Sequence, residues 1–183
     1  ALETAWPGKN VQVSVPASGG KPLRIGDDLS YAFESSSDGY LTAVHVDTHG
    51  ATTLLYPRSN PEEGRIGAAQ RVTLPGAGDS FTLEAQPPVG RDFVYAIVTE
   101  EPISRADLGI NSSDIVVSFE PQDAPDFLRR LRATLDARIN GSIQVAHVIQ
   151  QVDGRGDVQY RSADIVGFFG ERTRSIRPPK LDL

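Results

Sequence analysis

Short stretches in which apolar and polar residues alternate fill the first 120 positions of this 183-residue chain. Alternation with a period of two is typical of a β-strand that buries one face. Clusters of Gly, Pro, Asp and Asn separate the stretches at intervals of about 8–12 residues, which favours an antiparallel β-sandwich of the immunoglobulin-like kind. The strands predicted in this part are residues 11–15, 29–34, 40–48, 51–56, 71–74, 80–85, 93–99 and 115–119.

The apolar period becomes helical after residue 123. Phe127, Leu131 and Leu135 recur at the spacing that places them on one face of a helix. Asp123 suits the N-cap, and Gly141 follows the last apolar residue of the pattern. The sequence therefore predicts one helix, from residue 123 to residue 140, whose apolar face packs on the sandwich.

Two further strands, residues 143–152 and 157–169, are predicted to form a β-hairpin, and a basic tail follows at 172–183. The chain is thus predicted to be mainly β. Its β-sandwich domain covers residues 1–120, and a helix plus hairpin at 121–183 packs on that domain.

The charge of the chain limits its partners. The net charge is −6 at neutral pH, whereas binding to nucleic acid in bulk requires a basic surface. No apolar run approaches the ~18 residues of a membrane span. Residues 129–183 carry 10 basic and 6 acidic side chains, and four arginines of the predicted helix give this part a basic face. These candidate binding residues are Arg129, Arg130, Arg132 and Arg138.

A metal site is not predicted. The chain has no Cys, and the best candidate set is His45, Asp47 and His49, which alternate along one predicted strand. Three ligands on one strand span about 13 Å, too far to reach one ion. Asp47 and His49 also precede Gly50, as turn residues do. No cofactor is predicted either.

Catalytic residues are not predicted. The sequence lacks the Gly-x-Ser-x-Gly elbow of many hydrolases. Its paired carboxylates are adjacent in sequence, so they would point to opposite faces of a strand. A hydrolase that uses His45 or His147 remains a second alternative, which requires a carboxylate and a hydroxyl beside the histidine.

An ordered series of short motifs lies between residues 22 and 102. They are Pro22-Leu23-Arg24-Ile25-Gly26-Asp27, Leu29-Ser30-Tyr31-Ala32-Phe33, Asp38-Gly39-Tyr40-Leu41, Val46-Asp47, Leu54-Leu55-Tyr56-Pro57, Val72-Thr73-Leu74-Pro75, Pro87-Pro88-Val89-Gly90 and Ala96-Ile97-Val98-Thr99. This series resembles a bacterial domain-of-unknown-function family that is appended to caspase-like peptidases, serine/threonine kinases and tetratricopeptide-repeat proteins. The resemblance implies a small β-sandwich with an accessory or interaction role, and it brings no catalytic residues.

We therefore expect a non-enzymatic module that binds another protein or another domain of its parent chain. The resemblance implies an extracytoplasmic location, in the envelope or among secreted proteins of a bacterium. Specificity is expected in residues 103–183, with the four helix arginines as the leading recognition element. The first alternative is a glycan-binding or peptidoglycan-binding module that uses the aromatic side chains of Trp6, Tyr40 or Tyr56.

Overall fold

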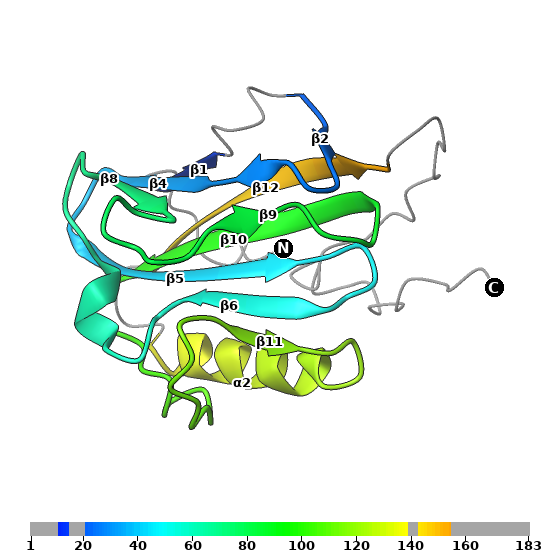
Figure 1. Ribbon diagram of the computed structural model, residues 1–183. Helices are drawn as coiled ribbons and strands as arrows, with labels where there is room; N and C mark the ends of the chain where they lie inside the picture. Colours follow the sequence, from blue (N-terminus) through cyan, green and yellow to red (C-terminus); the bar gives the residue numbers. More distant parts are fainter. Residues whose placement is uncertain (1–10, 15–20, 139–142, 155–183) are drawn as a thin grey trace.

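The computed structural model describes residues 11–14, 21–138 and 143–154 (Figure 1). The strands are β1 (Val11–Ser14), β2 (Leu23–Arg24), β3 (Asp28–Leu29), β4 (Tyr31–Ser35), β5 (Gly39–Val46), β6 (Thr52–Tyr56), β7 (Arg65–Ile66), β8 (Arg71–Leu74), β9 (Leu83–Glu84), β10 (Gly90–Thr99), β11 (Val117–Phe119) and β12 (Ile143–Asp153). The helices are the 3-10 helix η2 (Pro61–Gly64) and the α-helix α2 (Ala124–Ala137). The predicted mainly β fold with one α-helix is confirmed for these residues.

A large seven-stranded sheet is the centre of the fold. Its strand order is β11-β6-β5-β10-β12-β2, and β7 pairs with β5 beside this path. β10 is rich in Val, Ile and Tyr, residue types that suit a buried central strand. It pairs antiparallel with β5 on one side and with β12 on the other. β12 and β2 run parallel, a pairing that the antiparallel prediction did not include.

A second sheet, in the order β1-β4-β8, packs on one face of the large sheet. The core between them contains Tyr31 and Phe33 from β4, Leu41 from β5, Leu74 from β8 and Val94 from β10. The two layers form the predicted β-sandwich, and β3 and β9 form a separate two-stranded ribbon. We call this side of the large sheet the sandwich face.

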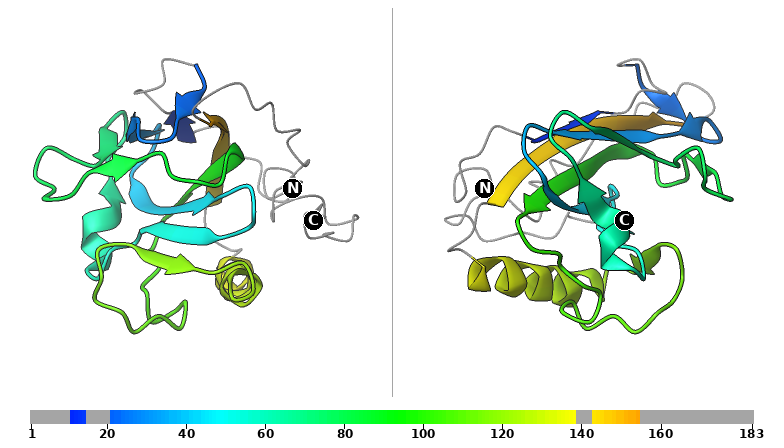
Figure 2. Two further views of the ribbon diagram at one scale, coloured as in Figure 1. Left: turned by 45° about the vertical axis from the view of Figure 1, so that its right-hand side comes forward. Right: turned by 90° about the vertical axis from the view of Figure 1, so that its left-hand side faces the viewer.

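The helix α2 covers the opposite face of the large sheet, which we call the helix face; Figure 2 shows α2 on the side of the molecule away from β1 and β4. Phe127, Leu131 and Leu135 are completely buried, as their spacing predicts. Asp123 occupies the N-cap position but forms no side-chain cap bond, and a proline stands in the first turn. The loop between β10 and β11 adds Ile103 and Leu108 to the same core.

β12 is an inner strand of the large sheet. It pairs with β10 from Ile143 to Val152, opposite Thr99 to Gly90. The segment after residue 120 therefore supplies both a packed helix and a strand between β10 and β2. The predicted return strand 157–169 and the basic tail 172–183 lie outside the described residues. Within the described part of the chain, no helix is long and apolar enough to cross a bilayer.

Candidate functional site

A histidine and an aspartate from neighbouring strands pair on the sandwich face. His45 of β5 lies opposite Val94 of β10, and Asp92 precedes Val94 by two residues, so both side chains project from the same face. His45 Nε2 lies 3.0 Å from Asp92 Oδ2. The side chain of His45 is 21% exposed and that of Asp92 only 7%. The carboxylate is thus the deeper member of the pair.

The start of β10 is held close to the turn that follows β5. Gly90 has a φ of 141°, and a Cβ on it would lie 2.2 Å from Oγ1 of Thr48, so only glycine fits at this position. The Thr48 hydroxyl donates a hydrogen bond to the carbonyl of Arg91, at 3.0 Å. This close approach aligns Asp92 with His45.

Two more polar side chains surround the pair. The ring of Tyr31, from β4, lies 6.4 Å from the ring of His45. Burial raises the pKa of Tyr31 far above its usual value, and the negative charge of Asp92 raises it further, so the phenol is neutral. Gln150 of β12 lies directly opposite Asp92 and is buried. The sandwich face therefore contains a polar cluster of Tyr31, His45, Asp92 and Gln150.

The other two candidate metal ligands serve the turn instead. Asp47 Oδ1 accepts hydrogen bonds from the backbone N–H groups of His49, at 2.8 Å, and Ala51, at 2.9 Å. Burial raises the pKa of Asp47, while these two hydrogen bonds act against the increase. Among the described residues, no three His, Cys, Asp or Glu side chains are grouped closely enough to hold a metal ion.

His147 lies on the opposite side of the large sheet from His45. It pairs with Tyr95, which belongs to the helix-face core, and their rings are 5.7 Å apart. His45 instead lies opposite Val94, a residue of the sandwich-face core. The two histidines therefore cannot act together at one site.

Two helix arginines form ion pairs within α2. Arg129 bonds to Asp126 and Arg132 to Asp136, at N–O distances of 2.5 and 2.9 Å. The first pair is largely exposed, with 73% of the Arg129 side chain accessible. Exposed pairs of this kind contribute about 0–1 kcal/mol.

The other two arginines attach the loop between β10 and β11 to the helix. Arg130 Nε donates to the carbonyl of Leu108, at 2.9 Å. Arg138 donates to the carbonyl of Pro102, at 2.9 Å, and contacts Asp107. The basic helix face predicted from the sequence is thus engaged by acidic side chains and carbonyls of the same chain.

The two tyrosines proposed for glycan binding have different surroundings. Tyr40 is half-buried at the start of β5. Tyr56 is only 4% exposed and belongs to the sandwich-face core. The guanidinium of Arg58 lies 5.3 Å from its ring centre. Because its faces are covered, Tyr56 offers no surface on which a sugar could stack, and Trp6 lies outside the described residues.

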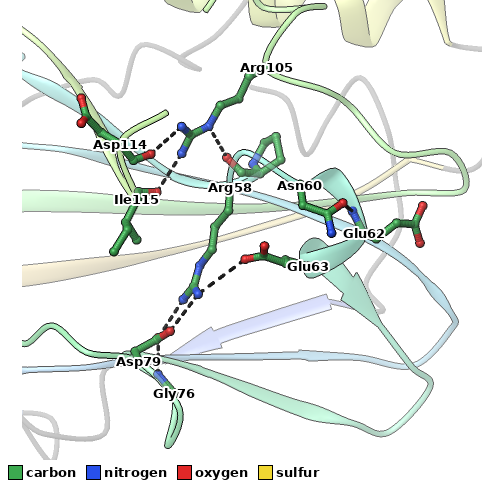
Figure 3. A network of polar contacts seen from close by, with 10 residues as sticks. Arg58, Asn60, Glu62, Glu63, Gly76, Asp79, Arg105, Asp114 and Ile115 are labelled. Atoms are coloured by element: carbon green, nitrogen blue, oxygen red, sulfur yellow. Dashed lines mark hydrogen bonds and ion pairs between the residues drawn. The ribbon is translucent and has the colours of Figure 1, made fainter. Parts of the chain in front are cut away.

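Arg58 is itself held in a network that connects two loops (Figure 3). Two guanidinium nitrogens donate to the two carboxylate oxygens of Asp79, each at 2.7 Å, and Glu63 lies 3.7 Å away. The guanidinium holds the pKa of Asp79 below its usual value. Arg58 also lies near the ring of Phe81, at 5.7 Å. This bidentate pair closes the loop between β8 and β9 over the core.

Arg105 forms a second network, in which the hydrogen bonds of its guanidinium go to backbone carbonyls (Figure 3). The side chain is buried and donates to the carbonyl oxygens of Pro57, Ser112, Asp114 and Ile115. Burial lowers its pKa, although a guanidinium stays charged at any ordinary pH. Arg105 thus fixes the loop between β10 and β11 against the end of β6.

The sequence alone pointed to His45 but not to its partner. Asp92 is 47 positions away, and Gln150 is more than a hundred, so no short motif connects the cluster. The sequence does contain one indication of the site: the charged residue Asp92 stands at the start of a strongly apolar strand. A buried carboxylate requires a partner, and the partner could be found only from strand register.

Fold and site together define a β-sandwich domain with a covering helix and a buried polar cluster. Residues 22–102 match the family model of a domain of unknown function, DUF4384, which confirms the resemblance expected for this segment. The match runs from β2 to the end of β10 and leaves out β1, β11, α2 and β12. No curated protein and no solved structure gives a significant match.

Proposed function

We propose that this chain is a non-enzymatic accessory module that binds another protein or another domain of its parent chain. The observation that carries the proposal is an exposed apolar side chain on the part of the sheet outside the family match. Ile149 of β12 is 50% exposed and lies opposite Phe93 on the helix face. Contiguous accessible apolar surface on a sheet face favours protein contacts, so Ile149 carries the proposal together with its neighbours.

The neighbours of Ile149 support this surface. Phe93 and Tyr95 are buried and stack along β10, with ring centres 6.3 Å apart, and His147 lies opposite Tyr95 on β12 with an exposed side chain. The helix arginines, in contrast, already bond within the chain. The preferred recognition surface is therefore Ile149 with His147, which we call the β12 patch.

The catalytic alternative has one supporting observation, the His45–Asp92 pair, which resembles the base and orienting carboxylate of a hydrolase. The described residues offer no Ser or Thr hydroxyl bonded to His45. The glycan-binding alternative loses support because Tyr56 is buried. An extracytoplasmic location in a bacterium stays part of the proposal and rests on the resemblance to the family alone.

Partner capture from a lysate of the source organism tests the proposal, with the bound proteins identified by mass spectrometry. Ile149→Ser should weaken binding of a specific partner about tenfold, because burying an isoleucine contributes about 1.5–3 kcal/mol. Arg129→Ala is the matched surface control and should leave binding unchanged. If Arg129→Ala removes the partner and Ile149→Ser does not, recognition belongs to the helix. If neither wild type nor variants retain a partner, the proposal is wrong.

A further inference from the structure

Asp92 and Gln150 face each other on β10 and β12 with hydrogen-bonding atoms that are not used. Counted as whole residues, Asp92 is 5% exposed and Gln150 is 4% exposed. Oδ1 of Asp92 and both amide atoms of Gln150 are buried, and no described residue offers them a hydrogen bond. His45 engages only Oδ2 of Asp92. Three buried polar atoms therefore gather at one register position of the large sheet.

Leaving these atoms unbonded would be costly. Each buried polar group without a partner destabilises a fold, and the effect is larger when the group is charged. Native proteins satisfy such groups with ordered water when protein atoms do not reach them. The group that bridges Asp92 and Gln150 must be small, because both side chains are enclosed by the sandwich.

The chemistry of the three atoms selects the bridging group. A carboxylate oxygen only accepts hydrogen bonds, so the bridge must donate to Asp92 Oδ1. The amide of Gln150 presents an acceptor and a donor, and water pairs with either one. A metal ion would instead require several oxygen ligands, and only Asp92 Oδ1 and the carbonyl oxygen of Gln150 are unused here.

We propose that a water molecule is bound between Asp92 and Gln150 as a fixed part of the sandwich core. It donates to Oδ1 of Asp92 and bonds to the amide of Gln150. Asp92 lies in the segment that matches the family model, and Gln150 lies outside it. The water thus joins the matched segment to β12 through a polar contact in addition to the backbone pairing.

A crystal structure of the chain at high resolution tests the site directly. The expected result is an ordered peak within about 3.2 Å of Asp92 Oδ1 and of one amide atom of Gln150. A direct hydrogen bond between the two side chains without such a peak would overturn the proposal. A peak with metal–oxygen distances would overturn it as well.

A pair of variants provides an independent measurement. Gln150→Leu removes one partner of the water, and the equilibrium constant for unfolding should rise about tenfold. Gln151→Leu changes the next residue, which is half-buried and points to the other face, and should leave that constant nearly unchanged. If Gln150→Leu is as stable as the wild type or more stable, the amide was not bonded and the proposal fails. If this variant does not fold, the crystal structure of the wild type decides.

Discussion

The two faces of the large sheet bury polar groups in different ways. On the helix face, Thr52 and Thr99 are buried, and each hydroxyl donates to a carbonyl two residues away in sequence, Gly50 and Glu101 respectively. On the sandwich face, His45 pairs with Asp92 across 47 positions, and Gln144 donates to Ser37 across 107. The two buried threonines of the helix face thus use local polar contacts, whereas the sandwich-face pairs join distant parts of the chain.

This difference separates the stability of the molecule from its specificity. The helix-face core consists of closely packed apolar side chains, such as Phe119 and Phe127, whose rings stack 4.3 Å apart. Apolar contacts tolerate many alternative arrangements. The sandwich-face contacts require one strand register, because a shift of one residue would leave Asp92 buried without His45. We infer that apolar packing on both faces stabilises the fold and that the polar contacts of the sandwich face select the arrangement.

The largest expected effect is on the helix face. Leu131→Ala should lower the free energy of unfolding by about 2–5 kcal/mol, because a completely buried leucine leaves a cavity. Urea denaturation measures this change. Arg129→Ala on the exposed side of the same helix is the control and should change stability by less than about 0.5 kcal/mol. A loss below that value for Leu131→Ala would mean that α2 contributes little to the core.

The next effect tests the loop that completes the helix-face core. Arg105→Lys should lower the free energy of unfolding by about 2–3 kcal/mol, because a single ammonium group cannot donate to all four carbonyls that the planar guanidinium reaches. Thermal and urea unfolding report the loss. The same exchange at the exposed Arg65 is the control and should have almost no effect. Equal stability of both variants would show that the carbonyls find other donors.

A double-mutant cycle sharpens the comparison on the sandwich face. His45→Leu should lower the free energy of unfolding by about 2 kcal/mol, because it leaves Asp92 as an unpaired buried charge. The loss is somewhat smaller than for a fully buried pair, since one fifth of the His45 side chain is exposed. The double variant His45→Leu/Asp92→Leu should recover at least half of this loss. If the double variant is less stable than either single variant, the His45–Asp92 pair is not what selects the strand register of the sandwich face.

The smallest expected effect is a dependence on pH at Asp79. The pKa of Asp79 in the folded protein is below its usual value of about 3.9 because Arg58 bonds to the carboxylate. A lowered folded pKa stabilises the fold above the unfolded pKa, and this contribution disappears as the pH falls through the folded pKa. Asp79→Asn should therefore lower the free energy of unfolding by about 1 kcal/mol at pH 6, and by less near pH 3. A difference that does not change with pH would contradict this account.

Much of the fold could be predicted from local patterns. β8 has the predicted bounds, and the strands β1, β5, β6 and β10 lie where the alternation indicates them. The two-residue strands β2, β3 and β7 were not predicted, because two residues are too few to show a period. The site could be predicted only in part: His45 was recognised, but Asp92, Gln150, Arg58 and Arg105 were not.

The sequence by itself determined the type of each element, the apolar face of α2 and the turn role of Asp47, because these depend on residues a few positions apart. Only the tertiary structure decided that β12 lies between β10 and β2 and that Asp92 meets His45. It also decided that the helix arginines bind carbonyls and carboxylates of their own chain. The physical reason is range: alternation and helical spacing are local properties, whereas strand order and the partner of a buried charge result from how distant segments pack.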